Sequence, residues 1–166
     1  MQPPAKLDDL IDALEFDFDE QSAWFDRETG RVVRVDQPLL RAVEDDDQKV
    51  LGDGCTWPDE EVELARAIVN DQGGRFIAAP DKFDFHEYRH MERFIGTLPD
   101  EQAADELWRA IKGKGAFRYF KDTAGRLGLL DQWYRYRDDA VKRFVLDWAE
   151  ANQIAVEGQV PRIHTN

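Results

Sequence analysis

The sequence predicts an α+β fold, with a small antiparallel hairpin or sheet in the N-terminal half and a helical C-terminal half. Strand-forming residues flank a Thr29-Gly30 turn, and one further short apolar run ends at Pro80. Apolar residues recur at helical spacing through most of the remaining chain and predict about seven helices. Strands that come early and helices that come late are typical of this fold class.

The length of 166 residues suits one ordinary domain with a core of its own. We expect a single domain over residues 1–166, because the first 48 residues alone are marginal for a core. The one candidate boundary is the stretch 49–59, whose glycines and proline predict a flexible loop. The tail at 157–166 is expected to be loose.

The N-terminal half begins with a predicted amphipathic helix over residues 5–15. Residues 22–28 and 31–35 then form the strands of a hairpin, since Gly30 can take a positive φ in the turn between them. Pro38 opens a second short helix, which ends in an acidic run. A helix through residues 62–68 and a strand at 75–79 complete this half.

The C-terminal half is predicted to be helical throughout. One helix runs over residues 85–95, and Gly96 is placed to take the left-handed conformation at its end. The next helix begins near Pro99, because proline fits the first turn of a helix, and it ends at Gly113. Two further helices are predicted at 115–127 and 130–152.

Charge and cysteine usage exclude several classes of protein. The chain has 35 acidic and 22 basic residues, a formal charge of −13, which disfavours a general nucleic-acid-binding protein. One cysteine excludes a disulfide framework and a cysteine-rich zinc site. The N-terminus does not resemble a secretory signal, and no apolar run approaches the length of a membrane span. We therefore expect a cytoplasmic protein without membrane contact.

The string His-Glu-Tyr-Arg-His at 86–90 fits the pattern H-E-x-x-H. On one continuous helix His86 and His90 share a face, and Glu87 can act as the general base for a zinc-bound water. Zinc also needs a third protein ligand, and the one other histidine, His164, lies in the tail. A zinc-dependent hydrolase therefore stays an alternative, against the simpler interpretation of two solvent-facing histidines.

A basic segment stands out in this acidic chain, because residues 109–126 hold six basic residues against one acidic residue. Two glycines bracket a lysine between two predicted helices, where unpaired backbone N–H groups and the helix dipole favour an anion. The cations of the second helix are spaced i, i+4 and i+7, so they share one face. The alternative is a simple helix corner whose cations pair with carboxylates of the chain. The segment comprises Lys112, Gly113, Lys114, Gly115, Arg118 and Lys121.

The last predicted helix places Arg137 in the middle of its apolar face, next to Trp133 and Tyr134. A buried guanidinium needs a carboxylate partner, and Glu92 is the candidate. We favour an ion pair that fixes two helices. The alternative is an arginine on the floor of a pocket walled by Trp133 and Tyr134.

Four segments resemble uncharacterised protein family 0158. They are Ala-Trp-Phe-Asp-Arg-Glu-Thr-Gly at 23–30, residues 83–94, Gly-Lys-Gly-Ala-Phe-Arg-Tyr-Phe-Lys-Asp at 113–122, and Trp-Tyr-Arg-Tyr-Arg at 133–137. The resemblance spans most of the chain, and the Gly-Lys-Gly-Ala-Phe string followed by Trp-Tyr is its most distinctive part. It implies a small cytosolic bacterial protein and brings no assigned reaction, cofactor or catalytic residue.

The sequence favours a non-catalytic binding or regulatory module that recognises an anionic group at the corner 113–121, without a cofactor. The partner is an unidentified protein or a phosphate-bearing small molecule, and the absence of a recognisable RNA-binding motif disfavours nucleic acid. The candidate ligand-binding residues are Lys112, Gly113, Lys114, Gly115, Arg118, Lys121, Trp133, Tyr134 and Arg137.

Overall fold

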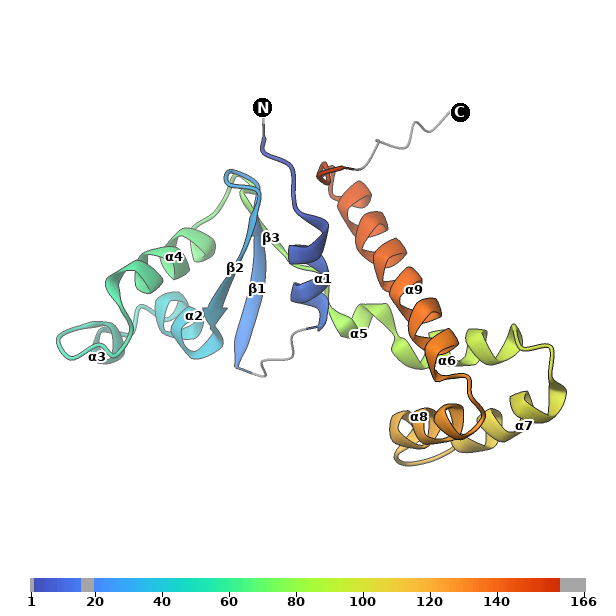
Figure 1. Cartoon of the computed structure of the whole chain (residues 1–166). Coiled ribbons are helices and arrows are strands. Elements are labelled where there is room, and N and C mark those ends of the chain that lie inside the picture. Colours follow the sequence, from blue (N-terminus) through green and yellow to red (C-terminus); the bar gives the residue numbers. More distant parts are fainter. Residues whose placement is uncertain (1, 16–19, 159–166) are drawn as a thin grey trace. The chain divides into compact units, whose positions relative to one another are not determined.

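The computed structural model describes residues 2–15 and 20–158 and confirms the α+β fold (Figure 1). The chain divides into two compact units. The first unit comprises residues 1–81 and 146–166, and the second comprises residues 82–145. No helix among the described residues is long and apolar enough to cross a membrane.

The first unit holds a three-stranded antiparallel sheet in the order β2-β1-β3. The strands are β1 (Gln21–Asp26), β2 (Arg31–Asp36) and β3 (Phe76–Ala78). The predicted hairpin is confirmed, with Asp26 opposite Arg31 at its closed end, and the third strand pairs with β1 on its other side. Gly30 has a φ of 74°, which fits the conformational freedom expected of it in the turn.

Helices α2 and α4 pack together on one face of this sheet (Figure 1). The helices of this part are α1 (Leu7–Glu15), α2 (Gln37–Glu44), α3 (Gln48–Leu51) and α4 (Asp59–Val69). The core that α2 and α4 share with the sheet consists of Val35, Leu39, Val62, Ala65, Ile68 and Phe76. The prediction of a loop over 49–59 is wrong at its start, because α3 extends to Leu51. The Asp47 side chain caps this short helix by accepting a hydrogen bond from the Lys49 N–H.

The ends of the first unit are joined by backbone hydrogen bonds. The Ala5 N–H donates to the Ala155 carbonyl at 2.8 Å, and the Glu157 N–H donates to the Ala5 carbonyl at 2.7 Å. Ala5 and Val156 thereby form a parallel bridge. The tail predicted to be loose lies outside the described residues from 159 onward.

A buried carboxylate organises the hairpin turn of the first unit. Asp26 is 3% exposed, and it accepts two hydrogen bonds from Arg75, from Nε to Oδ1 at 2.9 Å and from Nη2 to Oδ2 at 3.0 Å. The Glu28 N–H and the Thr29 hydroxyl donate to the same carboxylate. Burial alone would raise the pKa of Asp26, but these hydrogen bonds and the Arg75 charge hold it below its ordinary value of 3.8.

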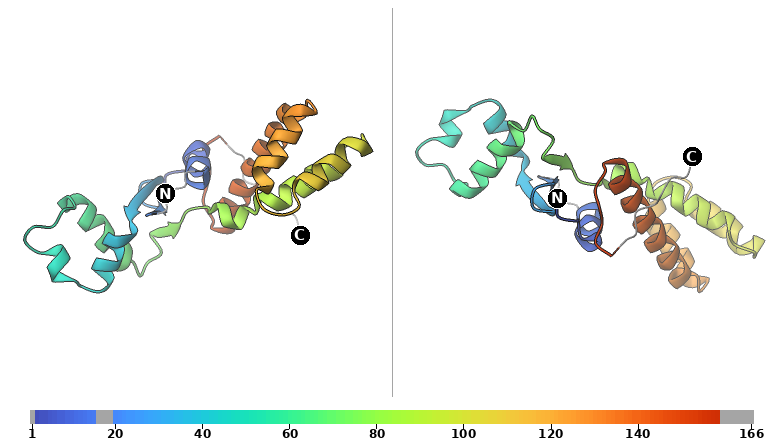
Figure 2. Two further views of the ribbon diagram at one scale, coloured as in Figure 1. Left: turned by 90° about the horizontal axis from the view of Figure 1, so that it is seen from below. Right: turned by 90° about the horizontal axis from the view of Figure 1, so that it is seen from above.

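The second unit is helical, and α7 packs against both α6 and α8 (Figure 2). Its helices are α5 (Lys82–Phe85), α6 (Glu87–Gly96), α7 (Glu101–Ala110), α8 (Ala116–Arg126) and the first part of α9 (Leu130–Ala151). Asp100 caps α7 by accepting hydrogen bonds from the N–H groups of Gln102 and Ala103. The predicted left-handed conformation of Gly96 is wrong, because Gly96 is the last residue of α6 and Thr97 follows it in a right-handed conformation.

An aromatic cluster forms the core of the second unit. The centre of the Trp133 ring lies 4.9 Å from the centre of the Phe120 ring and 5.5 Å from that of the Phe94 ring, both in edge-on contacts. Edge-to-face pairs of this kind add to the free energy gained from burial. Met91, Ile95, Leu107, Ile111, Ala116 and Ala124 complete this core.

Candidate anion-binding site

The segment 112–121 forms a corner between α7 and α8, which we call the basic corner. Gly113 and Gly115 have φ values of 92° and 75°, a region that side chains with a Cβ rarely adopt. A Cβ at Gly115 would also lie 3.1 Å from Cε2 of Tyr119. The corner therefore requires glycine at 115 for both backbone conformation and space.

Neighbouring helices hold the corner in place on both sides. The Tyr88 hydroxyl donates to the Ile111 carbonyl at 3.2 Å, which ties α6 to the end of α7. Arg126 donates to the Glu106 carboxylate at 2.6 Å, which ties α8 to α7. The Arg126 charge is thus paired with a carboxylate of the same unit.

The other cations of the corner are exposed to solvent. Lys112, Lys114 and Lys121 are exposed, and within residues 2–15 and 20–158 none of the three forms a salt bridge. The Arg118 side chain is 85% exposed, and within the described residues its one salt bridge is with Asp122, at 3.9 Å from Nε to Oδ2. A contact of this length between exposed side chains contributes little to stability. The basic corner is therefore not neutralised by carboxylates of the described chain.

The backbone of the corner adds hydrogen-bond donors to these charges. Helix α8 begins after Gly115, which provides no side-chain cap. The first N–H groups of a helix have no partner inside it, and the helix dipole makes this end favourable for an anion. Lysine ammonium groups and backbone donors thus occur at the same end of α8.

Exposed aromatic rings flank the cations, a feature that the sequence analysis missed. Phe117 is 49% exposed. Trp108 and Tyr119 are 36% and 56% exposed. Leu107 and Phe120 lie on the buried faces of α7 and α8. The exposed rings lie outside these faces, and helical spacing in the sequence could have shown this.

Trp133 and Tyr134 do not wall a common pocket, because they point to different environments. Trp133 is 1% exposed, and within the described chain its indole Nε1 has no hydrogen-bond partner. Tyr134 is 42% exposed. The structure places the Trp133 ring in the core of the second unit, so it is not accessible to a ligand at the surface.

The carboxylate that meets Arg137 is Glu87, not the expected Glu92. Arg137 Nε lies 2.5 Å from Oε1 of Glu87, and the guanidinium carbon lies 6.0 Å from the centre of the Phe85 ring. The two side chains are 22% and 30% exposed, so the pair is partly buried. This geometry agrees with an ion pair between two helices, as the sequence favoured.

The expected helix through 86–90 is interrupted at its first histidine. His86 has a left-handed φ of 54° and separates α5 from α6, so the two histidines do not lie one turn apart on a single helix. Its neighbour in the pattern, His90, stacks on the Phe85 ring at 4.2 Å. Burial and the nearby Arg93 charge lower the pKa of His90 below its ordinary value of 6.5.

No ligand set for a metal accompanies this pattern. Among the residues that the structure describes, no group of three or more His, Cys, Asp or Glu side chains could hold a metal ion. His164, considered above as a third ligand, lies outside the described residues. The geometry therefore gives the zinc alternative no support, because the motif lacks the helical frame that brings its ligands together.

Comparison with known proteins agrees with the resemblance found in the sequence. A UPF0158 protein of Pseudomonas aeruginosa is 26% identical over 107 residues, which cover 64% of this chain and 68% of that protein. No solved structure matches the chain. The model of the uncharacterised protein family UPF0158 matches residues 2–160, and the chain therefore belongs to this family.

Proposed function

We propose that this protein is a non-catalytic, cytoplasmic binding module that recognises an anionic group at the basic corner. One observation carries the proposal: in a chain of net charge −13, the exposed cations Lys112, Lys114 and Lys121 form no salt bridge within the described residues. The many carboxylates of the chain could neutralise such cations at little cost. Because no carboxylate of the described residues forms a salt bridge with these three lysines, they stay available to an external anion.

Each residue of the corner has a distinct role in this proposal. Lys114 and the backbone N–H groups that follow Gly115 hold the anion at the start of α8. Arg118, one turn further along, gives a planar two-donor contact to a phosphate or carboxylate. Trp133 and Arg137 take no part, since the first is buried and the second is paired with Glu87.

Thermal unfolding in the presence of candidate anions tests this proposal. A ligand at five times its Kd stabilises a protein by about 1 kcal/mol, which raises the Tm of a domain of this size by about 2–4 °C. We expect such a rise with inorganic phosphate, ATP or a hexaglutamate peptide at low salt. The shift should shrink as salt is added, because salt screens exposed charges.

Lys114→Ala should abolish the shift, whereas Lys142→Ala should preserve it, because Lys142 is an exposed lysine of α9 outside the corner. A response to phosphate or ATP would identify a phosphate-bearing ligand, and a response to hexaglutamate alone would identify an acidic protein partner. No shift with any of the three anions, or an equal shift in Lys114→Ala, would contradict the proposal.

A further inference from the structure

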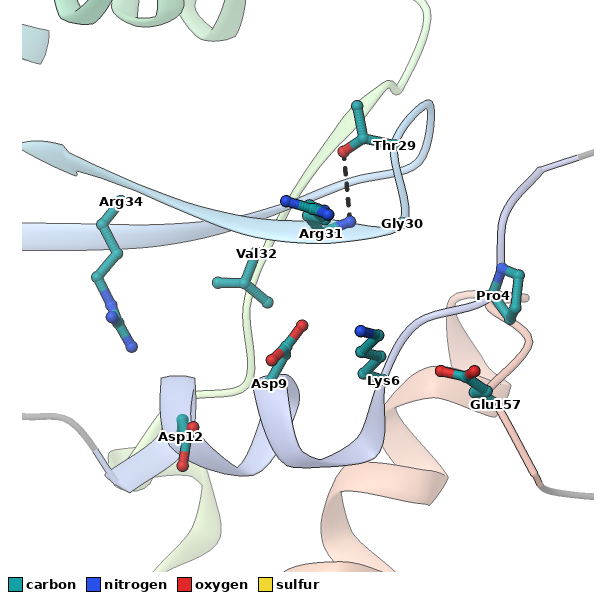
Figure 3. A pocket seen from close by; sticks show the side chains of 10 residues that line it. All are labelled: Pro4, Lys6, Asp9, Asp12, Thr29, Gly30, Arg31, Val32, Arg34 and Glu157. Atoms are coloured by element: carbon teal, nitrogen blue, oxygen red, sulfur yellow. Dashed lines mark hydrogen bonds between the residues drawn. The ribbon is translucent and has the colours of Figure 1, made fainter.

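A second candidate site lies in the first unit, remote in sequence from the basic corner. A cleft of about 650 Å³ runs between α1 and β2 (Figure 3). Its volume falls in the range of small-molecule sites, about 300–1,000 Å³. One end is closed by Pro4 and by Gly30 of the hairpin turn, where a Cβ would lie only 2.8 Å from the Pro4 carbonyl oxygen.

The closed end of the cleft is a built part of the fold. The two backbone hydrogen bonds of Ala5, to Ala155 and from Glu157, fix the segment that carries Pro4 and place Glu157 at the cleft. The cleft thus depends on ordered backbone from three separate parts of the chain.

Charged side chains of both signs line the cleft in equal number. The cations are Lys6, Arg31 and Arg34, and the carboxylates are Asp9, Asp12 and Glu157. Figure 3 shows Val32 and Arg34 directed from β2 toward α1, while Lys6 and Asp9 rise from α1 toward the strand. Val32 gives the cleft an apolar surface between the charges.

Most of these charges are not paired with one another. Over the described ranges 2–15 and 20–158, no salt bridge involves Lys6, Asp9, Asp12, Arg31 or Glu157. Arg75, at the other side of the same hairpin turn, contrasts with them, since it contacts both Asp26 and Glu28. The charges of these five side chains are therefore not neutralised by salt bridges within the described residues.

We propose that this cleft binds a short peptide that carries both cationic and anionic groups. A simple ion of either sign meets like charges as well as opposite ones in this lining, so the cleft offers neither sign a site of opposite charge alone. A ligand with both signs gains both attractions, and electrostatic complementarity of this kind determines specificity. An extended peptide suits this lining, because its side chains can place charges of opposite sign against both α1 and β2.

Nuclear magnetic resonance of the ¹⁵N-labelled full chain tests this inference, because amide shifts locate the bound peptide. The probes are three blocked tetrapeptides, one of alternating lysine and glutamate, one all lysine and one all glutamate. We expect the alternating peptide to shift the amides of Asp9, Thr29 and Arg31, with at least tenfold tighter binding there than either single-sign peptide. Shifts confined to residues 113–117 would instead report the basic corner, and would overturn the inference for the cleft.

Two variants and two matched controls complete the experiment. Asp9→Asn and Arg31→Gln should each weaken binding of the alternating peptide by about tenfold, the loss of one charged contact. Asp59→Asn and Arg66→Gln, at exposed positions of α4, should leave binding unchanged. The inference is wrong if the alternating peptide shifts none of these amides at millimolar concentration, if the all-glutamate peptide binds the cleft equally well, or if the cleft variants bind as tightly as the wild type.

Discussion

The hairpin turn of the first unit and the basic corner of the second use charge in opposite ways. At the hairpin turn, Asp26 is buried and its carboxylate accepts two hydrogen bonds from Arg75. At the basic corner, Lys114 is exposed, and the one salt bridge of Arg118 within the described residues is a 3.9 Å contact with Asp122. Both regions are tight turns next to a glycine with positive φ, so the difference lies in the partners of the charges.

The charges at the hairpin turn therefore contribute to the stability of the fold, whereas those at the basic corner belong to the candidate binding site. A buried carboxylate with several donors stabilises the fold, and removal of its charge leaves Arg75 without its main partner. Exposed cations without partners add almost nothing to stability, so substitution there should change binding and leave the fold intact.

The largest effect is expected at Asp26. Asp26→Asn should lower the free energy of unfolding by about 2–3 kcal/mol, since the Arg75 charge loses its buried partner. Urea denaturation at pH 7 measures this change. Because the folded state lowers the pKa of Asp26, its stabilisation is present above its unfolded pKa and is lost as the pH falls through the lower, folded value. The difference between wild type and variant should therefore shrink in acid.

Asp59→Asn is the matched control for that experiment, because Asp59 is exposed at the start of α4. It should change stability by less than about 0.5 kcal/mol. A loss at Asp26 no larger than at Asp59 would remove the structural half of the comparison.

Substitution by alanine should have opposite effects on stability at Gly115, the N-cap of α8, and at Gly125, inside α8. Gly115→Ala should destabilise by about 1 kcal/mol or more, because φ is 75° and the Cβ meets the Tyr119 ring. Gly125→Ala should stabilise by about 0.5–1 kcal/mol, since Gly125 lies in α8 with nothing within 4 Å of the added Cβ. Thermal and urea unfolding distinguish the two. Equal effects would mean that the corner does not require glycine at 115.

A double-mutant cycle on Glu87 and Arg137 should show a smaller effect. The pair is only partly buried, so we expect a coupling energy of about 0.5–1 kcal/mol between Glu87→Gln and Arg137→Gln. The cycle isolates this pair from the other contacts of Arg137. Replacement of Glu92 by Gln in the same cycle is the control, and coupling of Arg137 to Glu92 rather than to Glu87 would contradict the structure.

Local sequence patterns were sufficient for most elements of the fold. The hairpin at Gly30 and the start of a helix near Pro99 follow from residues within a few positions of each other, so the sequence alone predicts them. The break at His86 was not predictable in this way, since histidine adopts the left-handed conformation more often than most side chains but still too rarely to mark a helix break.

Long-range partners were beyond the sequence for a different reason. The Asp26–Arg75 pair joins residues 49 positions apart, and nothing near either residue indicates the other. The partner of Arg137 was placed on the correct helix but at the wrong residue, because the expected helix was continuous through His86. The exposure of the corner's cations followed from helical spacing, whereas the burial of Trp133 beside the exposed Tyr134 depends on tertiary packing.

The most direct test of the central claim is a site-resolved titration of the ¹⁵N-labelled protein with pyrophosphate at low salt. We predict saturable shifts of the amides from Gly113 to Phe117, lost in the Lys114→Ala/Arg118→Ala double variant and kept in Lys142→Ala. The double variant should unfold within about 0.5 kcal/mol of the wild type. Absence of shifts at these amides, or shifts that persist in the double variant, would contradict the claim that the basic corner is an anion-binding surface.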